Sequence, residues 1–518
     1  MSTQSDRETT FEVGETCWRV EKARRLGLIV DAADYFRALR QSMISATRQI
    51  MMIGWDFDFE IDMLPGEADD DGMAPDGLPN ALGPFIEALV ERNAGLDIYL
   101  LKWNGAVLMA PGRVIPSAAM AAFSDDRIHF ALDGHHPFGA CHHQKIVVLD
   151  DRVAFCGGID ATQERWDTRD HTPDDPLRTG LGGELMPPWH DVTAVLDSPA
   201  AEALGELSRQ RWLRATDDRI DAPRNDAGGA DWPDYADVAV RDVNVAIMRT
   251  EPPYDGVEIV DEIEQHYLAA IRSARDVIYA ESQYLSAEAI IDALEERLRE
   301  PDGPEVVIVN PQAARAALED QAMHTLRARA LYRLMAAAPA GRFRAFYPVN
   351  AAEEPIYVHA KVMIVDDGVL RVGSSNIDDR SMGFDTECDI AFEGTHENAR
   401  EAIRAFRLSL LAEHLDTDPD TVAEAWEREG SLVAAIDTLN SSEGRGLRVI
   451  EPKEETWTGK LLADTRMFDR RYERGENTRT GEGIRPRHLA AAAGVGVVLV
   501  AGWLAWRYGT HRKSDRAV

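Results

Sequence analysis

Hydrophobic positions along the chain follow a helical period in some stretches and form short continuous runs in others. Residues 45–55, "SATRQIMMIGW", end a helical pattern and lead into an apolar run, and residues 273–284, "SARDVIYAESQY", do the same. Residues 82–103 and 290–311 each give an amphipathic helix, a glycine-containing turn and an apolar strand. The pattern therefore predicts an α/β chain in which one arrangement of helices and strands occurs twice.

The repetition also predicts the domain organisation. Each half reads as strand, helix and strand followed by a pair of strands, which is typical of an α/β unit with a mixed sheet. A duplicated chain can bring equivalent edges together, so we predict a pseudo-two-fold axis with one site across it. The predicted segments are an N-terminal lead at 1–30, a first half at 31–235, a second half at 236–440, a linker and basic juxtamembrane segment at 441–487, an apolar helix at 488–507 and a tail at 508–518.

The last apolar stretch differs from the rest of the chain. Residues 489–506 carry no charge, and arginines lie on both sides of them. About 18 apolar residues is the lower limit for a helix that spans a bilayer. Residues 466–487, just before it, have seven arginines against four acidic residues, which suits an anionic lipid surface. We therefore predict a single-pass C-terminal membrane anchor. The polar first residues show no secretory pattern, so we predict a cytoplasmic catalytic region.

Composition narrows the function. The 518 residues exceed one ordinary domain, and 45% of them are hydrophobic, as in folded proteins. A formal net charge of −34 argues against a nucleic-acid binder, because such proteins neutralise phosphates with Lys and Arg. The four cysteines form no C-x-x-C pair, so neither a disulfide framework nor a zinc site is predicted.

The strongest chemical signal is a doubled motif. "HQKIVVLDDRVAFCGGID" at 143–160 and "HAKVMIVDDGVLRVGSSN" at 359–376 share H-x-K, an aspartate after four more residues, and a glycine after six more. The shared positions are His143, Lys145, Asp150, Gly157, Gly158 and Asp160 in the first copy, and His359, Lys361, Asp366, Gly373, Ser374 and Asn376 in the second.

Alternation along a strand projects residues i and i+2 to one side. Each histidine therefore lies beside its lysine, and joining the halves gives two imidazoles and two ammonium groups in one pocket. Lysines bind phosphate oxygens as compact charges. One imidazole can attack phosphorus while the other protonates the leaving alkoxide and later deprotonates water. The lysines supply the charge stabilisation, so we predict no metal and no cofactor.

Other residues have supporting roles in this prediction. Asp150 and Asp366 follow buried strands and are predicted to fix turns, and His142 points away from His143. The glycine pairs let the backbone pack closely, with Ser374 and Asn376 as polar donors. A carboxylate usually fixes the tautomer of a catalytic imidazole. Asp191 in "PWHDVTAVL" and Glu387 in "DTECDIAF" are the candidates.

These residues resemble the phospholipase D superfamily, whose signature is H-x-K-x4-D-x6-G-(G/S)-x-(D/N), twice per chain. The match covers roughly residues 30–410 and is complete in both copies. The stretches "RWD", "PWHD", "ESQYL" and "RSMGFDTECDIA" look most like the eukaryotic-type phospholipases D. No module resembling a separate lipid-binding domain precedes the repeat, which puts regulation by calcium or phosphoinositides in doubt.

The resemblance implies the duplicated phospholipase D fold and a ping-pong phosphodiesterase. It would release the head-group alcohol and phosphatidic acid from phosphatidylcholine-like lipids, with water or another alcohol as acceptor. His143 would be the nucleophile and His359 the general acid/base, or the reverse. Lys145, Lys361 and Asn376 would bind phosphate. Alternatives are a cardiolipin-synthase-like phosphatidyltransferase, a nuclease-type phosphodiesterase and a non-enzymatic scaffold. The expected partner is a phospholipid membrane, without nucleic acid.

Overall fold

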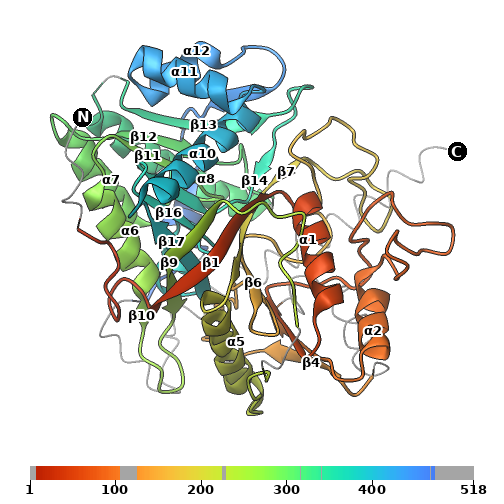
Figure 1. Ribbon diagram of the computed structural model, residues 1–518. Coiled ribbons are helices and arrows are strands. Elements are labelled where there is room, and N and C mark those ends of the chain that lie inside the picture. The colour runs from red at the N-terminus through yellow and green to blue at the C-terminus, as the bar shows by residue number, and fades with distance from the viewer. Residues whose placement is uncertain are drawn as a thin grey trace, which may run out of the picture.

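The structure is a computed structural model that describes residues 8–105, 125–224, 229–315, 317–339, 341–466 and 468–472. Most strands lie in one sixteen-stranded mixed sheet, with helices on both faces (Figure 1). The elements of the first half are β1 (Arg19–Val30), α1 (Ala32–Ser45), β2 (Gln49–Gly54), α2 (Leu82–Arg92), β3 (Asp97–Trp103), β4 (Ile128–Asp133), β5 (Ile146–Leu149), β6 (Val153–Gly157), β7 (Trp189–His190), β8 (Val192–Asp197) and α5 (Ala200–Thr216).

The second half repeats the order of the large-sheet strands and has further elements between and after them. Its elements are β9 (Val240–Glu251), β10 (Val260–Asp261), α6 (Glu262–Ser273), β11 (Val277–Glu281), α7 (Glu288–Arg299), β12 (Glu305–Val309), α8 (Ala317–Ala337), β13 (Phe343–Val349), β14 (Tyr357–Val358), β15 (Val362–Val365), β16 (Val369–Gly373), α9 (Asp379–Gly383), β17 (Glu387–Glu393), α10 (Glu397–His414), α11 (Pro419–Glu429), α12 (Leu432–Leu439), β18 (Gly446–Val449) and α13 (Trp457–Asp464).

The strand order of the large sheet is itself duplicated. From the centre outward, the first half runs β1-β8-β6-β5-β2-β3-β4 and the second runs β9-β17-β16-β15-β11-β12-β13, with β18 beyond it. In both halves the inner strands pair antiparallel and the outer three pair parallel. β1 and β9 pair antiparallel and join the halves near the middle of the molecule (Figure 1). The predicted segment boundaries stay a prediction.

Alternation along the strands fills a core on each face of the sheet. On β2, Met51 and Ile53 pack into the core that also contains α5 and α10, whereas Ile50 and Met52 pack against α1 and α2. In the second half, α6, α7 and α8 cover the face equivalent to that of α1 and α2. Each buried side chain of this size stabilises the fold by about 1.5–3 kcal/mol. The sheet is therefore rigid where it carries the H-x-K strands.

The fold class and the localisation predicted from the sequence included a membrane-spanning helix, and this part of the prediction is wrong. Among the residues that the structure describes, no helix is long and apolar enough to cross a membrane. The longest described helix, α8, has 21 residues and carries several charges. The predicted span at 488–507 lies outside the described residues.

Candidate active site

The first H-x-K motif lies where the two halves meet. The backbone N–H of His143 donates to the carbonyl of Thr386 (3.0 Å), and the N–H of Thr386 donates to the carbonyl of Cys141 (3.0 Å). This short parallel pairing sets the residues before β5 beside the residues that lead into β17. His143 thereby lies next to Glu387, which is 244 residues away in the sequence.

The second motif uses the same arrangement with the halves exchanged. β14 pairs parallel with β7, and the N–H of His359 donates to the carbonyl of His190 (2.8 Å). His359 thereby lies next to Asp191. Asp191 and Glu387 occupy equivalent positions in the two halves. Gly157 of β6 pairs with Thr193, which is two residues after Asp191. Gly373 of β16 pairs with Asp389, which is two residues after Glu387.

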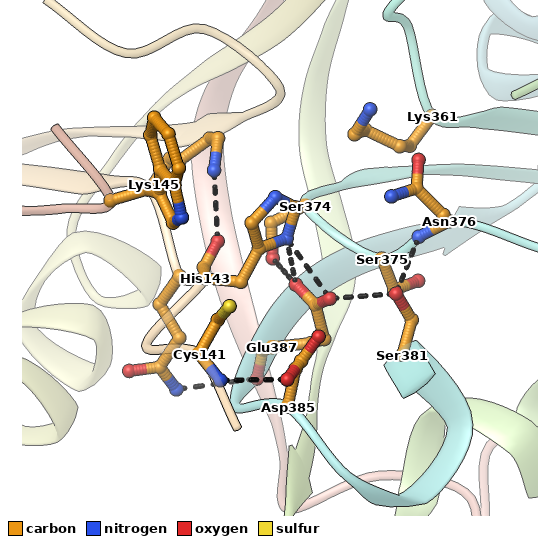
Figure 2. A network of polar contacts seen from close by, with 12 residues as sticks. Cys141, His143, Lys145, Lys361, Ser374, Ser375, Asn376, Ser381, Asp385 and Glu387 are labelled. Carbon is orange, nitrogen blue, oxygen red and sulfur yellow. Dashed lines mark hydrogen bonds and ion pairs between the residues drawn. The ribbon is translucent and has the colours of Figure 1, made fainter. Parts of the chain in front are cut away.

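Each imidazole contacts a carboxylate of the opposite half. His143 Nδ1 lies 2.9 and 3.0 Å from the two Glu387 oxygens, and His359 Nδ1 lies 2.7 Å from Asp191 Oδ2. The hydroxyls of Ser374 and Ser381 donate to Glu387 at 2.5 and 2.7 Å (Figure 2). Since Nδ1 is engaged in each ring, the Nε2 atoms are the ones that can react.

Two lysines complete the cluster. Lys145 Nζ donates to the carbonyl of His143 (3.1 Å) and lies 3.2 Å from Asp160 Oδ2. Lys361 Nζ donates to the carbonyl of His359 (2.5 Å), and within the described part of the chain it forms no ion pair with a carboxylate. Both side chains are buried. Figure 2 shows Lys361 and Asn376 across the site from Lys145. The arrangement can accept an anion.

Burial and the lysines shift the protonation of the imidazoles. Burial lowers the pKa of His143 well below its ordinary value, and Lys145 and Lys361 lower it further. Burial also lowers the pKa of His359, again with help from Lys361 and from Arg165. Both rings are therefore neutral near pH 7, as a nitrogen nucleophile requires.

The carboxylates shift in the opposite direction. Burial raises the pKa of Glu387 and of Asp191 to about 7, although hydrogen bonds and the nearby lysines act to lower it. Burial lowers the pKa of Lys361 to about 7, and the charge of Lys145 adds to this effect. Strong pKa shifts with specific charged neighbours are characteristic of functional sites.

The motif glycines make room for the carboxylates. A Cβ on Gly158 would lie 2.0 Å from Asp191 Oδ1, and a Cβ on Gly373 would lie within 2 Å of Asp389 Oδ1. Asp389 in turn accepts from the backbone N–H of Ser374 at 2.8 Å. Any larger residue at either glycine would displace a carboxylate that organises the site.

The motif aspartates lie away from the imidazoles. Asp150 accepts from the backbone N–H groups of Thr47, Arg48 and Gln49 at 2.7–2.8 Å, and Asp366 accepts equivalent bonds from residues 275–277. Both aspartates have positive φ, 53° and 51°, in the turn after their strand. They tie the H-x-K hairpins to β2 and β11. His142 is turned toward Asp133, at 2.6 Å.

The remaining motif positions are engaged in the protein itself. Asp160 accepts from the N–H of Trp55, and the N–H of Asn376 donates to the Ser381 hydroxyl. Ser374 donates to Glu387, so its hydroxyl supports the carboxylate. Asn376 Oδ1 is buried and makes no hydrogen bond within the described structure.

Sequence reasoning missed several residues of the site. The Trp189 ring lies 5.0 Å from the His359 ring and stacks on Tyr357, and the Arg165 guanidinium lies over the same ring, 4.3 Å from its centroid. The hydroxyl of Ser381, which donates to Glu387, is a second such residue. The stretches "PWHD" and "RSMGFDTECDIA" contain Trp189 and Ser381, so the signal was present without a role for these residues.

Comparisons with known proteins agree with this geometry. The family model described as Phospholipase D matches residues 347–436. Phospholipase D A of Dictyostelium discoideum is 24% identical over 472 residues, covering 76% of this chain and 36% of that protein. Phospholipase D alpha 4 of Arabidopsis thaliana is 25% identical over 508 residues, covering 75% and 64%. These matches support the phospholipase D superfamily for this chain, as the doubled motif predicted.

Within the superfamily, the relatives found are of the eukaryotic type, as the flanking stretches predicted. The chain spans about a third to two thirds of the length of the first of these phospholipases D. Among solved structures, the phosphatidylserine synthase of Haemophilus influenzae Rd KW20 has a TM-score of 0.54 at 10% identity, over 80% of this chain and 94% of that one. That similarity shows a shared fold alone.

Proposed function

We propose that this protein is a phospholipase D that hydrolyses the head-group phosphodiester of glycerophospholipids through a phosphohistidine. One observation carries the proposal. Two imidazoles, from equivalent motifs, each have Nδ1 against a carboxylate of the other half, and two buried lysines lie beside them. A catalyst for in-line displacement at phosphorus needs this combination of nucleophile, acid and fixed positive charge.

In the first step, Nε2 of His143 attacks the phosphorus. The N–P bond forms as the bond from phosphorus to the head-group oxygen breaks, and His359 gives a proton to that oxygen. Glu387 accepts the hydrogen bond from Nδ1–H and stabilises the positive charge that develops on the His143 ring. The bound phosphodiester anion raises the pKa of His359 toward its ordinary value, which supplies the proton.

In the second step, His359 takes a proton from water, and the water oxygen attacks the phosphohistidine. The P–N bond breaks, phosphatidic acid leaves and His143 is neutral again. Lys145 and Lys361 stabilise the charge on the phosphoryl oxygens throughout. A primary alcohol in place of water would yield a phosphatidyl alcohol.

The substrate class follows from the relatives' names and from charge. The relatives are phospholipases D, and a net charge of −34 opposes a nucleic-acid substrate. A phosphatidylcholine-like lipid presents one phosphodiester anion to two lysines. We therefore propose a phospholipid surface as the partner and water as the usual acceptor.

The test is product analysis with purified protein and mixed phospholipid vesicles, with and without 1-butanol. Wild-type protein should release phosphatidic acid, and butanol should divert product to phosphatidylbutanol. His143→Ala and His359→Ala should each reduce turnover by about 10³-fold or more. His129→Ala, at a partly exposed histidine of β4, is the matched control and should keep its activity.

Two results would contradict the proposal. Substantial turnover in either single variant would remove the two-histidine mechanism. Product that forms only with a lipid alcohol as acceptor would instead identify a phosphatidyltransferase.

A further inference from the structure

A second cluster of ionisable side chains lies beneath the His359–Asp191 pair. Asp31, His171, His190 and Glu413 are all buried, and one ligand atom from each lies within 4.8 Å of the others. They come from the N-cap of α1, a loop after the first motif, β7 and α10. The proposed reaction uses none of these four side chains.

The spacing of the donor atoms fits a tetrahedral ion. His171 Nε2 lies 3.6 Å from Asp31 Oδ2 and 3.3 Å from Glu413 Oε1. His190 Nδ1 lies 3.3 Å from Asp31 Oδ1 and 2.9 Å from Glu413 Oε1. A tetrahedron with bonds of about 2.1 Å has edges of about 3.4 Å. With Asp31 Oδ2 as the ligand atom of that residue, the three measured edges, 3.6, 3.3 and 2.9 Å, lie on both sides of that value, whereas Asp31 Oδ1 accepts from the Asp191 N–H.

The outer contacts are those that metal-ligating residues usually have. The other ring nitrogens are bound by carboxylates: His171 Nδ1 lies 2.9 Å from Asp167, and His190 Nε2 lies 2.8 Å from Glu281. The second oxygen of Glu413 pairs with Arg169 at 2.5 Å. Carboxylate partners fix the tautomer and orientation of metal-binding histidines.

Two of the four inward atoms form no hydrogen bond, whereas His171 Nε2 and Glu413 Oε1 are hydrogen-bonded to each other at 3.3 Å. Asp31 Oδ2 and His190 Nδ1 are buried and make no hydrogen bond in the described part of the chain, although His190 Nδ1 is close to two carboxylates. Contacts this short without hydrogen-bond geometry indicate lone pairs that converge on a common point. Unsatisfied buried polar atoms call for a ligand or an ion.

We propose that Asp31, His171, His190 and Glu413 bind one divalent ion of the Zn²⁺ type, with two nitrogen and two oxygen donors. Imidazole and carboxylate donors in a closed tetrahedral arrangement suit Zn²⁺. The set contains no cysteine, so it lies outside the C-x-x-C patterns on which the absence of a zinc site was predicted.

The ion would act as a structural link and would take no part in phosphoryl transfer. Asp31 accepts from the backbone N–H of Asp191 at 3.0 Å and donates its own N–H to the Asp191 carbonyl at 2.8 Å. Glu413 lies on α10 of the second half. The bound ion would therefore hold the halves together directly below the carboxylate that contacts His359.

The test uses full-length protein purified without a metal-affinity tag. Metal analysis should find about one Zn²⁺ per chain, or uptake of about one equivalent after chelation and dialysis against equimolar Zn²⁺. Zn²⁺ should raise the Tm of the chelated protein by roughly 2–5 °C at saturation. Co²⁺ should give the visible absorption of a tetrahedral site.

Variants separate this cluster from other histidines. His171→Asn and Glu413→Gln should lose the bound ion, whereas His129→Ala should keep it. A His143→Asn/His359→Asn double variant should also keep it, which excludes binding at the active site. If a cluster variant does not fold, the uptake and Tm of wild-type protein decide the result.

The proposal would be overturned if chelated wild-type protein took up no Zn²⁺ or Co²⁺ at equimolar concentration and its Tm did not change. The cluster would then be an ion-pair network of protonated histidines and carboxylates. Uptake that persists in His171→Asn and Glu413→Gln would overturn it equally. The readouts are metal content, absorption and Tm, so they are independent of the proposed lipid hydrolysis.

Discussion

Replacing Glu387, which contacts His143, should lower the activity but raise the stability of the protein at alkaline pH. Glu387→Gln keeps the shape of the side chain, and Gln can still bind the Ser374 and Ser381 hydroxyls. The change removes the negative charge that faces His143 Nδ1. A hydrogen bond to a charged group contributes about 1.5–3 kcal/mol. If that contribution is lost from the transition state, kcat falls by about 10- to 100-fold.

The same change should stabilise the fold at alkaline pH. Burial raises the pKa of Glu387 from 4.5 to about 7, so the ionised carboxylate destabilises the folded state by about 3 kcal/mol above pH 7. The folded pKa is the higher one, so this penalty shrinks as the pH falls below 7 and vanishes below about 4.5. Glu387→Gln should therefore be more stable than wild type at pH 8 and equally stable near pH 4.5.

Choline release from phosphatidylcholine micelles gives kcat, and urea unfolding at pH 8 and pH 4.5 gives the free energies of unfolding. Glu393→Gln is the matched control, since it makes the same chemical change at the far end of β17. It should leave kcat unchanged. A kcat of Glu387→Gln within twofold of wild type would refute the role of the carboxylate. Lower stability than wild type at pH 8 would refute the argument from burial.

Two further predictions concern the motif. Asp150→Asn should lower the free energy of unfolding by about 2–4 kcal/mol, because Asp150 accepts three backbone N–H bonds at the start of β2. The protein that remains folded should keep its kcat. Urea unfolding measures the stability, and active-site titration measures the kcat of the folded fraction. Gly158→Ala should reduce kcat at least tenfold by displacing Asp191. Gly95→Ala is the control and should keep its kcat, because the nearest atom to its new Cβ is at the end of a flexible side chain. Equal kcat values for the two variants would contradict the close approach of Gly158 to Asp191.

The sequence predicted the repeat and the strands that carry its motifs, because these depend on short-range patterns. The spacing of H-x-K, Asp and Gly is a local feature that marks a strand, a turn and a second strand, and the structure has β5–β6 and β15–β16 at those positions. The apolar runs at residues 49–54 and 277–281 are strands β2 and β11 for the same reason. The apolar run at residues 489–506 shows where such patterns fail, because its lack of charge was the basis for predicting a membrane helix, and that prediction is wrong.

Which carboxylate meets which histidine depends on the tertiary structure. Asp191 and Glu387 are candidates in the sequence, yet the exchange between halves arises from two short parallel pairings, β7 with β14 and residue 142 with residue 386. Those pairings connect the two halves, which β1 and β9 also join within the large sheet. The cluster of Asp31, His171, His190 and Glu413 is the extreme case, because its members are spread over almost 400 positions. Sequence by itself determined the chemical groups, and long-range packing decided their partners, because contacts between distant segments leave no local period in the chain.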